Sequence, residues 1–469
     1  GASWKRSDML RERLIGALGN DAVKTEPEDL SVYAFDAYTA GGRPAAVVLP
    51  RSTNEVSAVM KIARELGEPI VARGAGTGLC GGAVPAAGGV VVSTMRMNRI
   101  LELDLANRRA RVEPGLMNLD LSRSVAAEGL FYAPDPSSQQ ISTIGGNIAT
   151  NAGGPHCLSY GTTVNHILGL EVVDEAGEVF TTSIDEPGYD LTAALVGSEG
   201  TLGIVTAAWV RLLAQPEAVR VWVAAFDQME AASEAVSAIV AAGIVPTALE
   251  MMDAVIVKAV EAAFKAGYPT DAAAVLLIES AGFGEDVAAA DAAIATIVKC
   301  HGARYWRSAR TPAERDALWA GRKGAAGATG RIAPNYYTQD VCVPRSKLPA
   351  ALRAVEAAAA KNAITVGNVF HAGDGNLHPL LMYDRRDSRQ VAAVIETGNA
   401  ILESAIELGG TISGEHGIGW EKRDAMTRVY STADLATMGR VRDVFDPRHM
   451  LNPEKIFPNG ARCPEVTPP

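Results

Sequence analysis

Two of the seven histidines stand in one short motif whose spacing could hold a metal ion. His371 and His378 begin and end the segment HAGDGNLH, which lies between the β-like runs VGNVF and LLMY. The dipeptide Asp374-Gly375 favours a two-residue type I′ turn. Such a hairpin would place the two histidines directly opposite each other on one face, with their Cβ atoms ~5 Å apart. Two imidazoles so placed can bind one divalent metal together with a carboxylate.

Glu415 is the carboxylate that we expect to complete this set, because a tight turn in the segment SGEHGIG can present it. Zn²⁺, Mn²⁺ and Fe²⁺ all suit two imidazoles and one carboxylate. A hydrogen-bonded core histidine pair with an ion-paired glutamate is the alternative. The neighbouring His416 is the candidate general base, since histidine titrates near neutral pH and can remove a hydroxyl proton. A purely hydrogen-bonding role is the alternative for His416.

A second chemical feature is the glycine-rich loop at 73–82, RGAGTGLCGG, which contains a match to G-x-G-x-x-G at 76–81. A dinucleotide-binding Rossmann loop must follow a strand and open a helix. A strand precedes this loop, but GGAVPAAGG follows where the helix would begin. We therefore reject the Rossmann interpretation. The loop can still bind an anion, because glycines let backbone N–H groups approach and surround a group such as a pyrophosphate. Tight turns between strands are the alternative.

The segment 136–170 contains no Asp, Glu, Lys or Arg and holds six glycines. It offers amide and hydroxyl donors without carboxylates that would repel a phosphate. A long surface loop is the alternative, but loops of this length in a compact domain are usually functional or disordered. Together with the first glycine loop, this segment predicts a large polyanionic cofactor.

These loops need regular elements to position them, and the chain alternates between helical and strand patterns. The patterns predict a strand at 44–50, a strand leading into the glycine loop, and further strands with a turn at Ala106-Asn107. They also predict helices at 8–24, 52–67, 349–361 and 388–409. The composition becomes alanine-rich after about residue 215. We therefore expect one domain at 1–215, a second at 216–424, and a C-terminal segment at 425–469 that returns to the first.

Composition excludes several classes of protein. With 469 residues, 48% of them hydrophobic, the chain is long and apolar enough to bury several cores, which excludes a disordered or disulfide-stapled protein. A net charge of −11 argues against binding to nucleic acid. Five scattered cysteines, Cys463 among them, contain no Cys-x-x-Cys pair and fit a reducing, cytoplasmic compartment. The uncharged run 74–95 carries seven glycines and Pro85, so we expect no transmembrane segment.

Five segments, read in order from about residue 40 to the C-terminus, resemble one family. They are RGAGTGL, YAPDPSS, STIGGNIATNAGGPHCLSYG, GYDLTAALVGSEGTLGIVT and MLNPEKIFP. Together they resemble the FAD-binding oxidoreductases of the vanillyl-alcohol-oxidase (PCMH) type. Among these, they are most similar to the FAD-linked subunits of bacterial glycolate oxidases and to D-lactate and D-2-hydroxyglutarate dehydrogenases. The resemblance implies an α+β fold with a two-lobed FAD-binding domain and an α+β substrate (cap) domain built on an antiparallel sheet.

The resemblance also implies which residues line FAD. They are Arg73, Gly74, Ala75, Gly76, Thr77, Gly78, Pro134, Asp135, Ser137, Ser138, Thr143, Gly145, Gly146, Asn147, Asn151, Gly153, Glu199, Gly200, Ile204 and Asn452. Some members of this fold carry a histidine in the first loop that is linked covalently to the flavin. Thr77 and Leu79 stand in that region here, so we expect non-covalent FAD.

Relatives bind a metal at the positions of His371, His378 and Glu415, which the resemblance therefore implies as metal ligands. Arg322 in LWAGRKGAAG matches the family's arginine for the substrate carboxylate, whose planar fork binds carboxylates bidentately. Lys323 is the alternative cation for the substrate carboxylate. The non-functional alternative for both residues is an ordinary surface charge. Thr338 stands where the 2-hydroxyglutarate enzymes carry a basic residue, which favours a small monocarboxylate such as glycolate or D-lactate.

The implied activity is FAD- and divalent-metal-dependent oxidation of a small (D)-2-hydroxy acid to the 2-keto acid, with hydride transfer to flavin N5. Alternatives are a dehydrogenase of D-2-hydroxyglutarate or another D-2-hydroxy acid, and an electron-relay flavoprotein subunit. Expected electron acceptors are a flavin-type partner subunit with an iron–sulfur subunit, or else a quinone, a cytochrome or oxygen. Such partners would attach the protein peripherally to the inner membrane, and a homodimer is left open.

Overall fold

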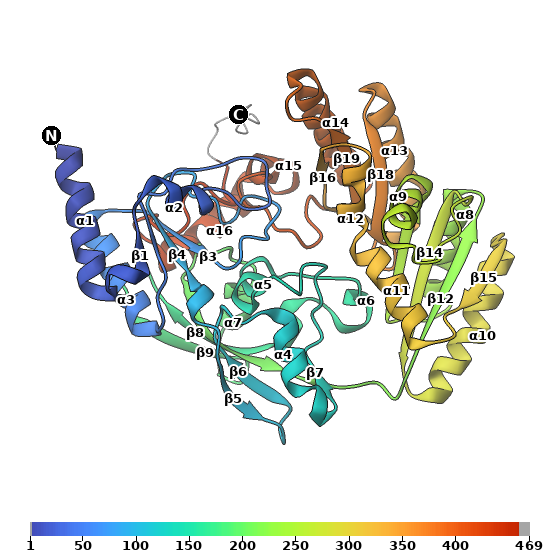
Figure 1. Cartoon of the computed structure of the whole chain (residues 1–469), viewed down its shortest axis with the longest axis horizontal. Coiled ribbons are helices and arrows are strands. Elements are labelled where there is room, and N and C mark those ends of the chain that lie inside the picture. Colours follow the sequence, from blue (N-terminus) through green and yellow to red (C-terminus); the bar gives the residue numbers. More distant parts are fainter. Residues whose placement is uncertain (1, 459–469) are drawn as a thin grey trace. The chain divides into compact units, whose positions relative to one another are not determined.

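The computed structural model describes residues 2–458, which fall into two compact units. Unit 1 comprises residues 2–153, 162–215 and 415–458, and unit 2 comprises Gly154–Gly161 and Pro216–Gly414. Both units combine helices with sheets (Figure 1), as the expected α+β class requires. Cys463, one of the five cysteines counted in the sequence, lies outside the described residues.

Unit 1 begins with a four-stranded sheet in the order β1-β2-β4-β3. The strands are β1 (Val23–Lys24), β2 (Ala46–Val48), β4 (Val90–Ser93) and β3 (Ile70–Arg73). The last three run parallel, because α3 (Thr53–Leu66) and the glycine-rich segment provide the crossovers. The predicted helix at 52–67 is confirmed: the Ser52 side chain accepts a hydrogen bond from the Glu55 amide, and Gly67 ends the helix in the left-handed conformation.

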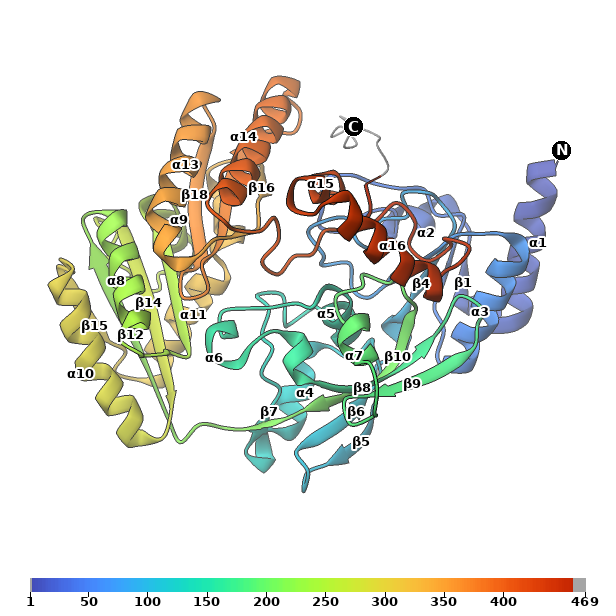
Figure 2. The same ribbon diagram turned by 180° about the vertical axis from the view of Figure 1, so that it is seen from behind.

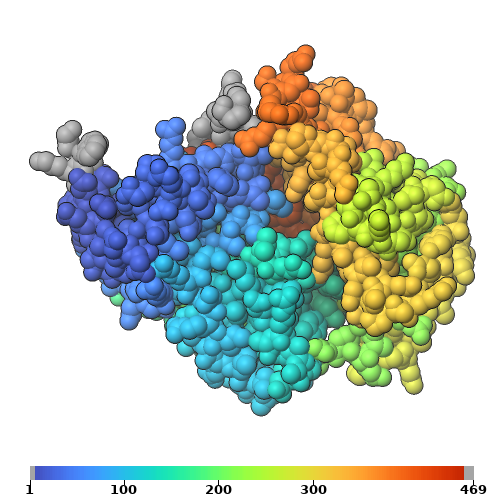
Figure 3. Space-filling model, in the orientation of Figure 1, coloured from blue at the N-terminus to red at the C-terminus, as the bar shows by residue number. Residues whose placement is uncertain are grey.

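The first predicted helix is displaced towards the N-terminus. Instead of 8–24, the helix α1 spans Ala2–Leu18, and Gly19 follows it at φ 86°. Leu10, Leu14 and Leu18 form the buried stripe that packs on the first sheet. The residues before this stripe carry no apolar periodicity, which is why the pattern alone did not find the true start. The space-filling view shows the blue N-terminal residues packed closely against the later parts of unit 1 (Figure 3).

A second, antiparallel sheet completes unit 1 in the order β5-β6-β10-β8-β9. Its strands are β5 (Ile100–Asp104), β6 (Arg109–Val112), β10 (Ile204–Arg211), β8 (Ile167–Val173) and β9 (Val179–Ser183). A short pair joins β7 (Leu130–Phe131) to β11 (Leu213–Ala214). The helices of this unit beyond α1 and α3 are α2 (Pro27–Val32), α4 (Asn118–Val125), α5 (Ile144–Thr150), α7 (Leu191–Leu195), α15 (Met426–Val429) and α16 (Thr432–Phe445).

The uncharged segment 136–170 is not a loop over its whole length. It contains α5, the short helix α6 (Cys157–Tyr160) of unit 2, and the start of β8. Thr143 caps α5 by accepting a hydrogen bond from the Gly146 amide at 3.1 Å. Small uncharged residues can therefore form capped turns of helix here as well as loops.

Unit 2 is built on one large antiparallel sheet with the strand order β15-β12-β14-β13-β18-β19-β16, and β17 pairs with β19. The strands are β12 (Ala218–Phe226), β13 (Ala248–Asp253), β14 (Ala274–Gly282), β15 (Tyr305–Ser308), β16 (Asn335–Thr338), β17 (Val341–Cys342), β18 (Thr365–His371) and β19 (Asn376–Tyr383). Every pairing given for these strands is antiparallel, which confirms the expected cap architecture.

Helices cover both faces of this sheet. One face carries α9 (Ala254–Phe264), α11 (Pro312–Lys323) and α12 (Ala325–Ala328). The other carries α8 (Met229–Ala241), α10 (Gly284–Cys300), α13 (Leu348–Lys361) and α14 (Ser388–Glu407), which are seen best from behind (Figure 2). The predicted helices at 349–361 and 388–409 are thus confirmed as α13 and α14.

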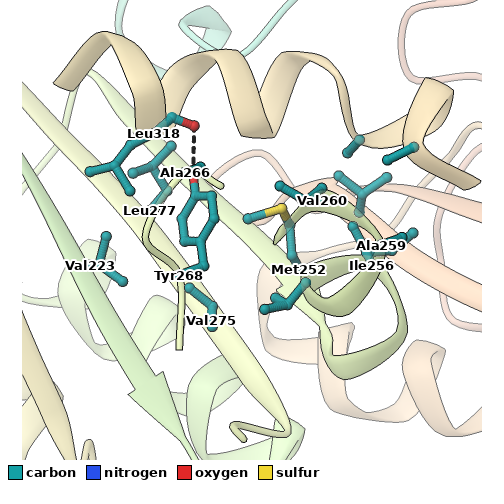
Figure 4. Close-up of a cluster of buried hydrophobic side chains, with 14 of the residues drawn as sticks. Val223, Met252, Ile256, Ala259, Val260, Ala266, Tyr268, Val275, Leu277 and Leu318 are labelled. Atoms are coloured by element: carbon teal, nitrogen blue, oxygen red, sulfur yellow. Dashed lines mark hydrogen bonds between the residues drawn. The ribbon is translucent and has the colours of Figure 1, made fainter. Parts of the chain in front are cut away.

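The apolar core of unit 2 fixes α11 against the sheet. Val223, Val275 and Leu277 from the strands pack on residues of α9 and α11 (Figure 4). At the centre of this cluster, the buried Tyr268 hydroxyl donates a hydrogen bond of 2.7 Å to the Leu318 carbonyl oxygen of α11. This core places the C-terminal turn of α11, which carries Arg322, over the sheet.

The boundary between the units differs from the expected domains at two places. The chain leaves unit 2 after Gly414 rather than after residue 424, and Gly154–Gly161 belongs to unit 2 although it interrupts the first domain in sequence. His156 explains the second difference, because its Nε2 lies 3.1 Å from Glu279 Oε1 on β14 and its ring packs on Trp319. These contacts hold the segment on unit 2, and composition gives no sign of them.

Tyr268→Phe should destabilise unit 2 by about 1–3 kcal/mol, because the Leu318 carbonyl would lose its buried partner. Urea denaturation followed by tryptophan fluorescence measures this change. Tyr305→Phe is the matched control, since Tyr305 packs on the same core and the structure records no hydrogen bond for its hydroxyl. Equal stabilities of the two variants would contradict the assigned role of the Tyr268 hydroxyl.

Candidate functional site

The histidine hairpin has a different register from the predicted one. His371 pairs with Asn376 and Val369 pairs with His378, so the loop consists of the four residues 372–375. The predicted two-residue turn is wrong, because the amides of Asp374 and Gly375 donate to the carbonyls of His371 and Ala372 and build a longer turn.

The expectation that both histidines share one face nevertheless holds. In an antiparallel pair, residues i and j+2 are diagonal neighbours on the same face. Asn376 pairs with His371, and His378 follows it by two positions on β19. The two imidazole centroids lie 5.1 Å apart with an interplanar angle of 85°. The pair is buried and close enough for both rings to reach one ion.

Further contacts hold the tip of this hairpin in place. The Val343 amide donates to the Gly375 carbonyl at 2.9 Å, and Arg345 Nε donates to the Gly373 carbonyl at 2.5 Å. Gly375 adopts φ 74°, and a Cβ atom there would clash with the Val343 carbonyl. Glycine is therefore required at the turn for its left-handed backbone and for this close approach.

His371 is oriented by Glu250, a buried residue of β13. His371 Nδ1 lies 2.9 Å from both carboxylate oxygens of Glu250. If Nδ1 carries the proton, the Nε2 lone pair points away from Glu250. Burial opposes the negative charge, but Arg322 and then His371 hold the pKa of Glu250 below its usual value.

Arg322 lies beside the histidines, as expected, but protein groups already engage its guanidinium. It forms an ion pair with Glu250, and its Nη2 lies 3.5 Å from His371 Nδ1. Only 5% of its side chain is exposed, and its buried Nε has no hydrogen-bond partner among the described residues. The alternative cation, Lys323, has its ammonium 5.7 Å from the centroid of the Trp319 ring.

Asp340 holds the chain that leads to the second predicted motif. Its Oδ2 accepts hydrogen bonds from Ser413 Oγ at 2.8 Å and from the Gly414 amide at 3.0 Å. Its Oδ1 lies 3.7 Å from His378 Nδ1. A Cβ atom on Gly414 would clash with the Asn376 side chain, so this turn lies tightly against the histidine hairpin.

Glu415 and His416 follow directly and are grouped with unit 1. Within that unit, His416 Nε2 lies 4.0 Å from Glu415 Oε1. Unit 2 by itself therefore brings together His371, His378 and Arg322. The hydrogen bonds from Ser413 and Gly414 to Asp340 are called the Asp340 clamp below. Glu415 follows Gly414 directly in the chain, so its backbone lies close to the end of this clamp.

Sequence patterns missed Glu250 and Asp340. Both are buried carboxylates, at 1% and 0% exposure, and each contacts a predicted histidine. Glu250 lies on β13 and Asp340 lies between β16 and β17, and neither forms a motif with the histidines along the chain. A buried-strand carboxylate in ALEMMD is the only signal that could have found Glu250, because such a group needs a partner.

The first glycine loop in unit 1 presents a row of unpaired backbone donors. Among the described residues, the amides of positions 74–79 donate no hydrogen bond to protein groups. Nearly all buried backbone N–H groups in proteins are paired, so consecutive unpaired amides in a partly buried loop fit an anionic ligand. This observation supports the predicted pyrophosphate contacts of Gly74, Ala75, Gly76, Thr77 and Gly78.

Arg73, which is expected to line FAD, contacts protein groups of unit 1, and its contact with FAD stays a prediction. Its guanidinium donates to the Phe35 carbonyl at 2.7 Å and lies over the Tyr33 ring. A Cβ atom on Gly76, at φ 75°, would clash with this guanidinium. Arg73 thus supports the loop from the protein side, and Gly76 is needed to leave room for it.

The second predicted segment and the residues before it contribute buried polar atoms that lack protein partners. In the part of the chain that the structure describes, these are Asn118 Oδ1, Tyr132 Oη, Ser142 Oγ and Asn147 Nδ2. Each unpaired group costs about 1–3 kcal/mol unless a ligand or water satisfies it. The amides of Ser137 and Ser138 also donate no hydrogen bond within the described chain. The residues around these positions therefore fit a polar cofactor.

Other predicted residues of this segment are used within the protein. Asn151 adopts φ 49°, and its Oδ1 accepts from the Val164 amide at 2.9 Å. A Cβ atom on Gly145 would lie 2.5 Å from Pro114 Cβ, and one on Gly74 would clash with Thr143. These contacts pack the glycine loop against α5. The Pro134 carbonyl accepts a hydrogen bond of 3.0 Å from Asn118 Nδ2. The expected FAD contacts of Pro134, Asp135 and Gly153 stay predictions.

Glu199 and Asn452 join four segments of unit 1 through hydrogen bonds. The buried carboxylate of Glu199 accepts hydrogen bonds of 2.7 Å from the amides of both Ile418 and Gly419. Asn452 Nδ2 donates to the Glu199 and Gly82 carbonyls at 2.7 and 2.8 Å. Both side chains therefore join segments within unit 1. Their expected contact with FAD stays a prediction. Gly200 and Ile204 continue from this junction into β10.

The charge of Glu199 predicts a pH effect on stability. Burial raises its pKa to about 7, although the two amide donors oppose the shift. The folded state then binds this proton more tightly than the unfolded state, so the contribution of Glu199 is present below about pH 4.5 and is lost as pH rises towards 7.

Glu199→Gln should remove this dependence, at a magnitude on the order of 1–3 kcal/mol. Thermal unfolding of both proteins between pH 5 and pH 8 checks the prediction. The melting temperature of the variant should rise relative to wild type as pH increases. Parallel curves would contradict the raised pKa of Glu199.

Family models match both parts of the chain. The model "FAD binding domain" matches residues 44–183, and "FAD linked oxidases, C-terminal domain" matches residues 215–456. Three curated relatives align over most of the chain. Glycolate oxidase subunit GlcD of Escherichia coli (strain K12) is 45% identical over 93% of this chain and 89% of its own length. The same subunit of Bacillus subtilis (strain 168) is 42% identical over 97% of both, and D-lactate dehydrogenase of Anaerostipes hadrus is 34% identical over 88% and 90%.

Solved structures share the fold at low sequence identity. 4-Ethylphenol oxidase from Gulosibacter chungangensis superposes with a TM-score of 0.80 at 18% identity, covering 98% of both chains. p-Cresol methylhydroxylase gives a TM-score of 0.77 at 16% identity, also covering 98% of both. These structures confirm the expected vanillyl-alcohol-oxidase-type fold.

The family models and relatives also confirm the resemblance read from the five segments, and they make FAD the cofactor. The unpaired amides of residues 74–79 suit its pyrophosphate. This chain belongs to the FAD-linked oxidases, a family of FAD-dependent oxidoreductases.

Proposed function

We propose that this protein oxidises a small (D)-2-hydroxy acid, glycolate or D-lactate, to the 2-keto acid with FAD and one divalent metal. The observation that carries the proposal is the buried pair His371 and His378, with ring centroids 5.1 Å apart beside Arg322. Relatives named glycolate oxidase subunit and D-lactate dehydrogenase support this substrate class.

The donor set fits a divalent metal. Two imidazoles share one face, and the Asp340 clamp on Ser413 and Gly414 lies directly before Glu415, the proposed third ligand. Zn²⁺, Mn²⁺ and Fe²⁺ remain the candidates. When bound, the metal would lower the pKa of the substrate hydroxyl as a Lewis acid, and FAD would accept the hydride at N5.

The remaining chemistry belongs to side chains of the protein. His416 is proposed as the base that accepts the hydroxyl proton on a ring nitrogen. Arg322 is proposed to attract the substrate carboxylate with the guanidinium donors that Glu250 does not engage. Its buried, unpartnered Nε supports this role, because an unsatisfied donor of this kind is costly without a ligand.

The size of the substrate is proposed from the neighbouring strand. Thr338 lies on β16, its hydroxyl donates to the Gln339 carbonyl at 3.1 Å, and Tyr337 Oη accepts from Gln339 Nε2 at 2.8 Å. Since no positive charge stands at position 338, a second carboxylate would lack a partner there. This favours a monocarboxylate over D-2-hydroxyglutarate.

The electron acceptor follows from the same relatives. The names of the glycolate oxidase relatives call each of them a subunit, which favours a complex. We propose that a flavin-type subunit and an iron–sulfur subunit of such a complex receive the electrons. A self-contained D-lactate dehydrogenase that passes electrons to a quinone, cytochrome or oxygen is the second candidate, favoured by the D-lactate dehydrogenase relative. We propose a cytoplasmic location with attachment to the inner membrane through partners; among the described helices, none is long and apolar enough to cross a bilayer.

An anaerobic visible spectrum tests the substrate class directly. Glycolate or D-lactate should bleach the flavin absorbance, whereas L-lactate and D-2-hydroxyglutarate should leave it nearly unchanged. Bleaching by D-2-hydroxyglutarate alone would refute the size argument from Thr338. A flavin that none of the four acids reduces would favour the electron-relay alternative.

His371→Ala should abolish metal binding and turnover while FAD remains bound, because FAD is proposed to bind through unit 1. Metal content by mass spectrometry, flavin absorbance and turnover are measured on the same sample. His301→Ala is the matched control, since this histidine follows α10 and bonds only to the Ile297 carbonyl through Nδ1. Full turnover of metal-depleted wild type would refute the metal role.

His416→Ala should retain the metal but slow flavin reduction by roughly 10²–10⁴-fold, the usual contribution of a general base. Stopped-flow reduction with glycolate or D-lactate measures the rate. The loss should diminish as pH rises, because hydroxide can replace the missing base. A wild-type reduction rate in this variant would exclude His416 as the base.

A further inference from the structure

We propose that Glu250 is a positioning residue that orients His371 towards the metal, and that Arg322 is the counter-ion that makes this buried carboxylate tolerable. This inference rests on the proposed function, because it concerns how the protein prepares one metal ligand. It assigns a role to a residue that the sequence motifs do not contain.

The pairing of β13 with β18 places the two residues together. Met251 pairs with Phe370 and Met252 with Val369. Extending this antiparallel register by one position sets Glu250 directly opposite His371, with both side chains on the same face. The distance from His371 Nδ1 to each Glu250 oxygen, 2.9 Å, agrees with this arrangement.

The carboxylate decides which ring nitrogen carries the proton. A carboxylate accepts but does not donate, so it selects the tautomer of His371 protonated on Nδ1. The Nε2 atom, on the opposite side of the ring, then carries the lone pair that a metal ligand needs. A carboxylate behind a metal-binding histidine orients the ring and raises its basicity.

The ion pair with Arg322 explains how Glu250 can be charged inside the protein. The two side chains are only 1% and 5% exposed, and an isolated charge at that depth would be very costly. Arg322 therefore has a structural effect on His371 that is separate from any contact with substrate. Removing either partner alone should leave the other charge buried and unpaired.

Metal affinity shows whether Glu250 orients His371 or only stabilises the fold. FAD-loaded, metal-depleted protein is titrated with Mn²⁺, and unbound Mn²⁺ is measured by electron paramagnetic resonance. Glu250→Gln should weaken Mn²⁺ binding by about 10–100-fold, the usual effect of losing such a carboxylate. FAD content should remain that of wild type.

Glu279→Gln is the matched control. Glu279 is a buried carboxylate on the neighbouring strand β14 that also contacts a histidine, His156, and accepts a hydrogen bond from Trp319 Nε1 at 2.7 Å. It has no contact with His371 in the structure. Its variant should bind Mn²⁺ within about threefold of wild type if the effect of Glu250 is specific.

A double variant tests whether an unpaired buried charge, rather than the loss of the carboxylate, impairs folding. Glu250→Gln combined with Arg322→Met removes both charges, so no buried charge is left unpaired. Weak Mn²⁺ binding by this folded double variant would support the proposal as well. If the Glu250 variants bind Mn²⁺ as tightly as wild type, the positioning role is overturned while the metal site stands.

Two further outcomes separate this inference from the proposed function. Absence of Mn²⁺, Zn²⁺ and Fe²⁺ binding to wild type would overturn the metal-dependent function and this inference with it. The tautomer is tested without metal by ¹⁵N NMR of histidine-labelled wild type, with the His371 signal identified by its loss in His371→Ala. A ring protonated on Nε2 rather than Nδ1 would overturn the orientation by Glu250 alone.

Discussion

The antiparallel pairing of β18 with β13 on one side and β19 on the other is the constraint on which the candidate site depends. Side chains alternate between the two faces of a sheet, so register decides which residues meet. In the observed register, His371 lies opposite Glu250 on one neighbour and diagonal to His378 on the other. A slip of one residue in either pairing would turn the partner to the opposite face.

Buried charge is the second organising feature. Glu250 is balanced by Arg322, Asp340 by hydrogen bonds from Ser413 and Gly414, and Glu199 by two backbone amides. Each carboxylate lies where two segments distant in sequence meet. Because an unpaired buried charge is so unfavourable, each one specifies a single arrangement of those segments. The polar groups thus contribute mainly to specificity, while the apolar core around Tyr268 supplies packing.

The glycines serve two different purposes. In the loop 74–79 their value is the row of backbone amides left without protein partners, which suits the phosphates of FAD. At Gly76, Gly375 and Gly414 the structure shows a steric need, because a Cβ atom would clash with Arg73, Val343 or Asn376. A glycine-rich motif can therefore have two reasons that composition does not separate. Some glycines leave space for a ligand, and others leave space for neighbouring atoms of the protein.

Local chemistry in the sequence determined a good deal. The capped helix that ends at Gly67 and the helices α13 and α14 follow from patterns that act over short distances. The antiparallel sheet of unit 2, the family and its FAD cofactor follow from the resemblance carried by five short segments. The shared face of His371 and His378 also follows, since strand periodicity is local. The length of their turn does not, because Val343 and Arg345 hold its tip from elsewhere in the chain.

Only the tertiary structure decided the partners of the predicted residues. It set Glu250 behind His371, turned Arg73 towards Phe35, used Glu199 to bind the amides of residues 418–419, and attached His156 to unit 2. These partners are separated by 38 to 220 positions in sequence. The physical reason is that burial makes a polar group find a partner somewhere, but only the packing of distant strands and loops determines which one.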